Sequence, residues 1–497
     1  MLPSEQPSTC YEVLAALVAE QAVVIRSQAA RIAELERRLG MNSSNSGTPS
    51  SKESIEATAR RKAERQSSQR VRSKDRKPGG QKGRKGSGLE PARGGELDRS
   101  EPVDPPVECS SCGAGLAGAA PAGFGWAQVW DTVPIVLEKV GYVLPRRRCS
   151  CCGKVTTAVP PAGQAGTVSY GPNVNAAAVL LGSEGNVPIE RTAMLMEALL
   201  GMPVSTGFIA RALARLADRL AAGGFDAAMK AALGAEDVLC ADETPVNIAR
   251  KDLDAAGEPV KGSEHVITIR TPGERLVWLT ATSSRSSGAI KAVGVLNDWH
   301  GYLVRDDYAG WHQFDDQLAG VGQCGAHLIR HLQGVLDLDP TWQAWAGKVQ
   351  QILREANTAV GDAKTRGEHH LDPILLAGLR ARYDEQVAWG IATNRHRDWH
   401  KGNHPGYVLA RRLADKADQV WLWTHDFAVP WTNNASERAL KSPKLHQKVS
   451  GYWHTLATAT RFCRVRSYLT SARNHGIRPI DAIHAALTGN PWLPTPA

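Results

Sequence analysis

The segment from residue 41 to about residue 100 limits what this chain can fold into. It is rich in Ser, Asn, Gly, Pro and charged residues, beginning with "MNSSNSGTPSSKE" and containing "KPGGQKGRKGSG". A composition with so few large apolar side chains cannot bury a core. We therefore expect a flexible arm over residues 41–100, which separates an N-terminal element, residues 1–40, from the remainder of a 497-residue chain.

This arm also carries nearly all of the net charge. Between Arg60 and Lys85 there are twelve Lys or Arg residues and two acids, whereas the whole chain carries a net charge of +9. Such a block neutralises DNA phosphates by counterion release, which gives salt-sensitive binding without sequence preference. A solubilising tail is the alternative. The basic residues predicted to contact DNA here are Arg60, Arg61, Lys62, Arg76, Lys77, Lys82, Arg84 and Lys85.

Residues 1–40 read as a helix with an apolar repeat. Tyr11, Val18, Ile25, Ile32 and Leu39 recur every seven residues. This spacing is typical of a coiled coil, although an ordinary amphipathic helix remains open; both favour self-association. No apolar run approaches the roughly 18 residues that a membrane span needs, and there is no secretory signal. We therefore expect a cytoplasmic protein without a membrane partner.

Two cysteine pairs with the same spacing follow the arm. Cys109 and Cys112 lie in "CSSCG", and Cys149 and Cys152 lie in "CSCCG". Four thiolates presented by two such turns suit structural Zn²⁺. The intervening "GWAQVWDTVPIVLEKVGYVLPRRR" reads as strands, so residues 101–165 are predicted to form a zinc ribbon. A disulfide framework is the alternative, but the nine cysteines are odd in number. Cys151 has no assigned role.

Residues 170–230 have a helical pattern. "PIERTAMLMEALL" ends at Gly201, and Ser205 can N-cap the following "TGFIARALARLADRL". Helix, short turn and helix is the outline of a DNA-binding helix-turn-helix, although any αα-hairpin has the same outline. Arg211 and Arg215 are four residues apart, so they share a helix face that can lie along DNA.

Two apolar segments each carry an acidic residue near the end of a predicted strand. "DVLCADETPVNI" and "GYLVRDDYAGW" read as strands that carry Asp242 and Asp306 at their ends, with "HVITIR" and "RLVWLTAT" as strands between them. If the strands are neighbours, the carboxylates converge and favour a magnesium site. Asp242 is chosen over Glu243 because successive strand residues point to opposite faces. Acids that merely satisfy loop amides are the alternative.

A third acid lies in "TNNASERALK". Asn434 and Glu437 match a capping box, in which Glu437 only closes a helix end, unless Glu437 joins the two aspartates. The residues between Asp306 and Glu437 must hold their own structure, and 336–428 have helical periods, which predicts a helical insertion. Three basic residues suited to a polyanion follow Glu437: Lys441, Lys444 and Lys448.

"CGAHLIRHL" places His327 and His331 on one helix face. A metalloprotease helix would need a Glu between them, and none is there. We predict that His327 and the nearby Arg330 are auxiliary active-site residues, with His327 contacting phosphate or a metal-bound water. A buried histidine satisfied by its neighbours is the alternative.

The ordered set of "NSSNSGTPSS", "KPGGQKGRKG", the cysteine pairs, "ADETP", "DDYAGW", "CGAHLIRHL" and "NNASERALK" resembles the insertion sequence 66 family of bacterial transposases over nearly the whole chain. The chain departs from the family pattern at Asp307, where Gly is usual, and at Trp311, where Tyr is usual. His331 and Lys441 also stand where other basic residues are more common. The role of Asp307 is left open.

The resemblance implies an α/β multidomain protein with a ribonuclease H-like core over residues 235–335 and 429–475, and a tail over 476–497. It implies a catalytic triad of Asp242, Asp306 and Glu437 holding two Mg²⁺ or Mn²⁺ ions. Such enzymes cleave double-stranded DNA at the element's terminal inverted repeats and join the freed 3′-hydroxyl to target DNA, sometimes with accessory proteins of the same element. The alternatives are a non-catalytic, zinc-containing DNA-binding protein derived from a transposon, and a general nuclease of the same fold.

Overall fold

The computed structural model of the chain describes residues 7–41, 45, 91–125, 127–131, 135, 137–159, 168–250 and 263–496. The eight arm residues predicted to contact DNA, between Arg60 and Lys85, lie outside the described residues. The chain divides into two compact units. One comprises Met1–Ala63 with Glu138–Ala497, and the other is Glu64–Leu137.

The larger unit is built on a mixed five-stranded sheet. Its strands are β3 (Val238–Pro245), β4 (His265–Arg270), β5 (Val277–Thr282), β6 (Tyr302–Arg305) and β7 (Gly320–Gln323). They lie in the order β5-β4-β3-β6-β7, with β3, β4 and β5 antiparallel and with β6 and β7 parallel to β3. The mixed α/β class is as expected, and the first four strands coincide with the predicted segments.

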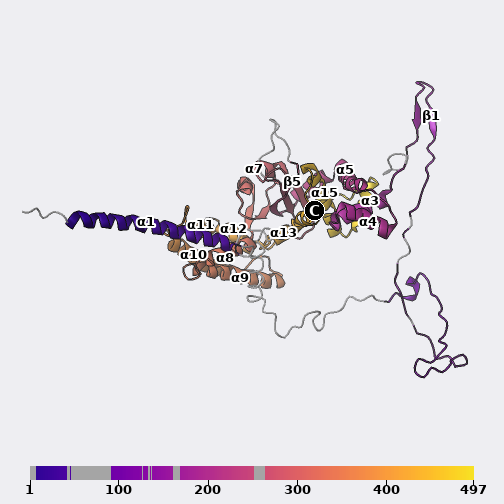
Figure 1. Cartoon of the computed structure of the whole chain (residues 1–497), viewed down its shortest axis with the longest axis horizontal. Coiled ribbons are helices and arrows are strands. Elements are labelled where there is room, and N and C mark those ends of the chain that lie inside the picture. Colours follow the sequence, from indigo (N-terminus) through magenta and orange to yellow (C-terminus); the bar gives the residue numbers. More distant parts are fainter. Residues whose placement is uncertain are drawn as a thin grey trace, which may run out of the picture. The chain divides into compact units, whose positions relative to one another are not determined.

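One group of helices packs against β3 and β6. It comprises α8 (Gly325–Leu336), α9 (Ala344–Thr365), α10 (Pro373–Asn394), α11 (Pro405–Asp415) and α12 (Ala417–His425), which cluster together in Figure 1. Trp345, Tyr383 and Trp421 are fully buried within their shared core. The predicted helical stretch "GYVLARRLADKADQVWLWT" forms two helices, because the helix is interrupted at Lys416. Residues between β6 and α13 (Asn434–Ala439) are therefore largely helical, as the periods predict.

The opposite edge of the sheet is covered by α15 (Leu456–Asn474), which packs along β5. The hydroxyl oxygens of Ser467 and Ser471 accept hydrogen bonds from the backbone amides of Leu279 and Val277, at 2.7 and 3.0 Å respectively. Because an uncovered edge strand can pair with another chain, these two serines close the sheet at this side. The helices α14 (Lys441–Ser450) and α16 (Pro479–Leu487) flank α15 in sequence, with α7 (Ser287–Ala292) following β5.

A helical group precedes the sheet. It contains α3 (Pro172–Val179), a short π-helical turn (Leu180–Glu184), α4 (Ile189–Leu200), α5 (Thr206–Ala222) and α6 (Phe225–Gly234). Gly201 ends α4 with a φ of +60°, and the Ser205 hydroxyl caps α5 by accepting the amide of Phe208 at 3.1 Å. Both predicted boundaries are confirmed. Figure 1 shows α3, α4 and α5 together beside α15.

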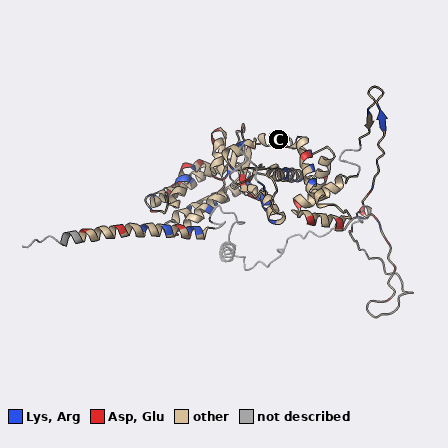
Figure 2. Ribbon diagram, turned by 45° about the horizontal axis from the view of Figure 1, so that its top comes forward, with Lys and Arg blue, Asp and Glu red and all other residues tan. Residues whose placement is uncertain are grey.

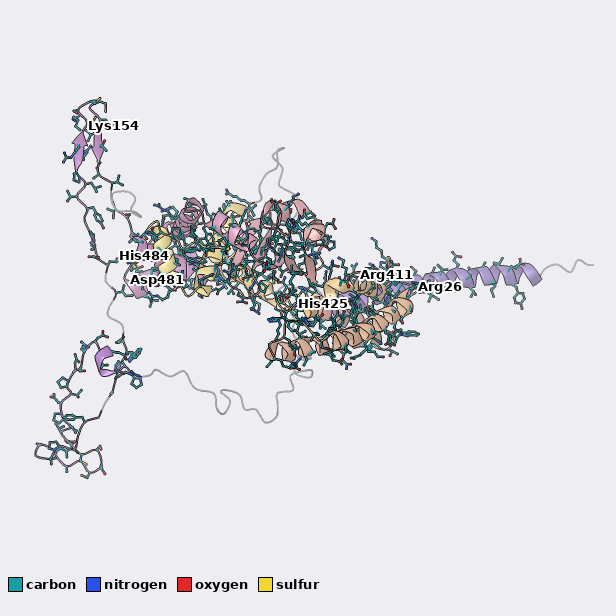
Figure 3. All side chains as sticks on the ribbon, turned by 180° about the vertical axis from the view of Figure 1, so that it is seen from behind. Arg26, Lys154, Arg411, His425, Asp481 and His484 are labelled. Carbon is teal, nitrogen blue, oxygen red and sulfur yellow. The ribbon has the colours of Figure 1, made fainter. Side chains whose placement is uncertain are left out.

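The predicted N-terminal helix is α1 (Pro7–Gly40), a single element. Its heptad residues are exposed, with Tyr11 at 76% and Ile25 at 63%, and Figure 3 shows side chains such as that of Arg26 projecting along its length. Acidic and basic residues both occur along the helix in Figure 2. Contrary to our expectation, Tyr11–Gly40 is long and apolar enough to cross a membrane, a test of length and composition that some soluble helices and signal sequences also meet.

Most of the strands expected before the second cysteine pair are not found among the residues that the structure describes. Among the described residues of 125–148, only β1 (Arg146–Arg148) is a strand, and it pairs antiparallel with β2 (Val155–Thr157). β1 consists of three exposed arginines and is the blue strand of Figure 2. Lys154 lies in the turn of this hairpin (Figure 3). In the smaller unit, Gly94–Glu96 forms a single 3-10 turn.

Candidate active site

Asp242 lies within β3, and Asp306 directly follows the neighbouring strand β6. β3 and β6 run parallel, and Cys240 and Val304 are the last residues that pair. Each aspartate follows its paired residue by two positions, so the two side chains share one face of the sheet. Burial, and then the charges of Glu243, Asp306 and Glu437, raise the pKa of Asp242 well above its usual range. The fold therefore gathers acids whose negative charges disfavour one another at this end of β3 and β6, which we call the acidic edge.

Glu437 reaches this edge through a tether at the start of α13. The N-cap residue of α13 is Asn433, which is 1% exposed, and its side-chain amide donates to the Ala241 carbonyl at 2.6 Å. Ala241 directly precedes Asp242, and Glu437 lies one turn along α13. The hydrogen bond therefore fixes the helix that carries the third acid against the strand that carries the first.

The capping box predicted for this helix is wrong. The helix is capped one residue earlier than expected, by Asn433, whose side chain makes no capping hydrogen bond. The Glu437 carboxylate instead accepts hydrogen bonds from Arg330 at 2.9 and 3.3 Å and lies 3.8 Å from Nε2 of His327. The local pattern failed because tertiary partners hold the side chains of Asn433 and Glu437.

The donor set of the two aspartates suits a divalent cation. Among the described residues, the Asp242 carboxylate accepts one hydrogen bond, from the backbone amide of Glu243 at 2.9 Å. The Asp306 carboxylate accepts one from the backbone amide of Tyr308 at 3.0 Å. Oxygen atoms thus remain available on both, and hard carboxylate oxygens are the ligands that Mg²⁺ prefers. Within the described stretches no three or more His, Cys, Asp or Glu side chains form a metal-binding group. Arg330 holds the Glu437 carboxylate in this arrangement.

Asp307 has a different environment from its neighbour. Its carboxylate pairs with Lys416 and lies 3.7 Å from Nε of Arg412 and 3.1 Å from Nε2 of His312. Burial alone would raise the pKa of Asp307, but the Lys416 hydrogen bond and the positive charges hold it below its usual value. Asp307 is therefore neutralised by cations from the helical insertion, whereas Asp306 faces other acids.

Glu243 is a buried acid beside this cluster. Its side chain is 5% exposed, accepts a hydrogen bond from Nε1 of Trp311 at 2.9 Å, and lies 3.7 Å from Nη1 of Arg285. Burial, and then the charge of Asp306, raise the pKa of Glu243 to about 7. Strand alternation thus does not isolate Glu243 from Asp306 as we had expected, since Asp306 raises the pKa values of Asp242 and Glu243 alike.

The charged form of both histidines of α8 is disfavoured. Burial, and then the charge of Arg330, lower the pKa of His327. Burial and the charge of Arg412 lower the pKa of His331 to about 3, and a guanidinium nitrogen of Arg412 lies 2.8 Å from its Nδ1. A neutral ring can hydrogen-bond without adding charge. Of the two predicted auxiliary residues, Arg330 binds Glu437 and His327 lies beside it.

The remaining predicted DNA contacts differ in availability. Arg215 donates to Oδ1 of Asn175 at 2.6 and 2.9 Å and lies over the Phe208 ring, so it is held within the helical group. Arg211 on the same helix is exposed. On α14, Lys441 and Lys448 are exposed and Lys444 is half-buried.

Each cysteine pair forms the same kind of turn. The amide of Cys109 donates to Ala114 and that of Gly113 to Cys109, at 2.8 and 2.9 Å. The amides of Cys149 and Gly153 repeat this pattern with Lys154 and Cys149, at 2.8 and 3.0 Å. The two glycines have φ of +74° and +71°, which favours glycine.

Backbone amides in each turn lower the pKa of its first thiol. For Cys109 the main donors are the amides of Cys112 and Ser111, and for Cys149 those of Cys152 and Cys151. All four predicted ligands are free thiols. A thiolate stabilised by amides is the form that binds Zn²⁺, so each turn by itself fits one half of a tetrahedral zinc site.

Sequence reasoning set one residue of this site aside and missed others. Glu243, inside "ADETP", was weighed against Asp242 and rejected on strand alternation, although it adjoins Asp242. Asn433, Arg412 and Lys416 had no local signal, because their roles arise from contacts between elements far apart in the chain.

The sequence model of the transposase IS66 family matches residues 167–461, which include the sheet, the helical insertion and all three acids. Residues 3–90 match a family of unknown function (DUF6444). No curated protein matches the chain significantly. The chain belongs to the IS66 family of transposases, because that match covers more than half of it.

Proposed function

We propose that this transposase cleaves DNA at the terminal inverted repeats of its insertion sequence and joins the freed 3′ end to target DNA. We propose further that its sheet is a ribonuclease H-like core whose catalytic residues are Asp242, Asp306 and Glu437. The observation that carries this proposal is the matched position of the two aspartates on β3 and β6, with Glu437 tethered beside them through Asn433.

Asp242, Asp306 and Glu437 would hold two Mg²⁺ or Mn²⁺ ions. When bound, such ions lower the pKa of an attacking water or hydroxyl and neutralise charge on the leaving oxygen. Arg330 orients the Glu437 carboxylate, which it contacts at 2.9 Å. His327, whose charged form burial disfavours, would hydrogen-bond a phosphate oxygen or an attacking water. In phosphodiester chemistry of this kind, the protein contributes mainly positioning and charge neutralisation.

DNA binding is proposed for three regions. The basic arm supplies salt-sensitive affinity for the phosphate backbone. Arg211, exposed on α5, supports a contact by the helix-turn-helix, whereas the internal partners of Arg215 favour a structural role for that residue. The exposed Lys441 and Lys448 on α14 follow directly after the helix of Glu437, so they are available to DNA held at the acids.

The other proposals concern assembly. Cys109, Cys112, Cys149 and Cys152 are proposed to bind one structural Zn²⁺, which the matching turns support. The exposed heptad residues of α1 support a homo-oligomer formed through this helix. Accessory proteins of the same element and a cytoplasmic location remain proposals that follow from the family.

The test is strand cleavage and joining of DNA that carries the element's ends, with Mg²⁺ or Mn²⁺. We expect the wild-type protein to cut at the repeats, and Asp242→Asn or Glu437→Gln to reduce the rate by at least about a hundred-fold. Unchanged cleavage in these variants would show that the site is elsewhere. Binding without cleavage under either metal would favour the non-catalytic DNA-binding protein, and cleavage indifferent to the repeats would favour a general nuclease.

A further inference from the structure

Glu243 joins two segments that meet beside the acidic edge. One carboxylate oxygen accepts the indole N–H of Trp311 at 2.9 Å, and the other lies 3.7 Å from a guanidinium nitrogen of Arg285. Trp311 is fully buried in the 3-10 segment Ala309–Gln317 that follows β6, and Arg285 lies in the loop after β5. One buried carboxylate on β3 therefore links segments that follow two other strands of the sheet.

Residues of both segments contact Tyr308 and fix its position. The guanidinium of Arg285 lies over the Tyr308 ring at 4.3 Å, and the Tyr308 hydroxyl donates to the Arg285 carbonyl at 3.0 Å. The Trp311 amide in turn donates to the Tyr308 carbonyl at 3.1 Å. The tyrosine is thus fixed at its ring, its hydroxyl and its carbonyl.

Tyr308 is the residue that orients Asp306. Its amide donates to Oδ1 of Asp306 at 3.0 Å, within the short turn that follows β6. The turn has little room to shift, because a Cβ placed on Gly310 would lie 2.5 Å from Cε1 of Tyr308 and 2.9 Å from Cδ1 of Ile290. The position of the Asp306 carboxylate therefore depends on the position of Tyr308.

We propose that Glu243 is a positioning residue that holds the Asp306 carboxylate in place through the Tyr308 turn. This inference rests on the proposed function, since it assumes that Asp306 holds a divalent ion. Glu243 acts through Arg285 and Trp311 and is not itself a metal ligand. Asp307, which follows Asp306 in the chain, cannot take this role, because the Asp307 carboxylate is already paired with Lys416.

The chemistry of the contacts separates this role from that of a ligand. A carboxamide at position 243 would keep an oxygen acceptor for the Trp311 N–H and would lose the charge that faces Arg285. Removing the side chain would release both partners. Residues that orient metal ligands typically change metal affinity by about 10–100-fold when they are removed, whereas replacing a ligand abolishes the site.

The experiment compares Glu243→Ala, Glu243→Gln and Trp311→Phe in the full chain with Asp306→Asn. Mn²⁺ binding is measured by calorimetry and by electron paramagnetic resonance, together with the dependence of the cleavage rate on Mn²⁺ concentration. Glu355→Gln is the matched control, because this acid pairs with Arg382 on the surface of the helical insertion. Thermal unfolding identifies any variant that fails to fold.

We expect Glu243→Ala to weaken Mn²⁺ binding by about 10-fold or more and Glu243→Gln and Trp311→Phe to weaken it less. Cleavage by these variants should recover at high Mn²⁺, whereas that by Asp306→Asn should not. Wild-type affinity in a folded Glu243→Ala, or a Glu243→Gln that binds as poorly as Asp306→Asn, would overturn the positioning role. Mn²⁺ binding without cleavage by the wild-type protein would instead count against the proposed function, and the affinity comparison would still test the role of Glu243.

Discussion

Asp242 and Asp306 stand side by side because each lies two residues beyond the last pair of the parallel ladder between β3 and β6. The sheet places these two carboxylates at matching positions, with Glu243 beside them. Their negative charges repel one another, which costs electrostatic free energy. The arrangement is therefore costly for the protein by itself and becomes favourable when cations bind.

The Asp242→Asn variant should consequently be more stable than the wild-type protein in the absence of metal. Burial, Glu243 and Asp306 all disfavour the ionised form of the Asp242 carboxyl, and an amide at this position carries no charge, so at pH 8.5 in EDTA we expect the melting temperature to rise by about 2 °C or more. Calorimetry measures the change. An equal or lower melting temperature in EDTA would mean that the acids do not repel one another as described.

Stability of the metal-free protein should depend on pH through Glu243. Its pKa is raised from 4.5 to about 7 in the folded protein, so the folded state holds this proton more tightly than the unfolded chain does. The contribution is fully present below pH 4.5 and is lost as the pH rises through about 7, and it amounts to up to about 3 kcal/mol.

The measurement is the difference in unfolding free energy between wild-type protein and Glu243→Gln, taken from urea titrations between pH 5 and 8. Taking the difference removes the opposite contributions of His327 and His331, whose pKa values are lowered. We expect the wild-type protein to lose stability relative to the variant as the pH rises. A pH-independent difference would contradict this account.

Asn433 should matter far more than Asn434. Asn433→Ala removes the hydrogen bond to the buried Ala241 carbonyl, so we expect a loss of about 1–3 kcal/mol in unfolding free energy. Asn434 is exposed, and its replacement by Ala should change stability by less than about 0.5 kcal/mol. Urea denaturation compares the two. The reverse order would restore the capping box as the better description of this helix.

Zinc removal should affect the cysteine turns and leave the sheet folded. We expect one Zn²⁺ per chain by elemental analysis, lost on replacement of any of the four predicted ligands by Ser, while Cys151→Ser, at an exposed thiol, retains the metal. Chelation should leave the main melting transition in place. Protein purified without bound zinc, or zinc loss in Cys151→Ser alone, would contradict the assignment.

The serines that cover β5 offer a separate test of the fold. Replacing both Ser467 and Ser471 with Ala leaves the amides of Leu279 and Val277 without their acceptors. We expect a loss of about 2–4 kcal/mol for the pair and increased aggregation on heating, because the strand edge is released. Light scattering follows the aggregation, and Thr460→Ala, on the same helix, is the control.

The sequence was informative where apolar runs were long and where their ends carried acids. β4 coincides with the predicted "HVITIR" because its six residues are all buried. β7 was missed, since "GVGQ" is short and its glycines lie where a Cβ would approach Tyr302 and Val304 at 3.2 Å. The site shows the same limit, because the contacts of Asn433, Asp307 and Glu243 depend on partners that no local pattern specifies.

The insertion between Asp306 and Glu437 has a consequence during synthesis. These residues are 131 positions apart, and at about 5–20 residues per second a ribosome needs roughly 7–26 s to translate that stretch. A nascent or prematurely terminated chain can thus present both aspartates while still lacking the acid on α13. On the proposed function, copies that stop before residue 437 would be unable to cut the host chromosome, since they lack the third acid of the site.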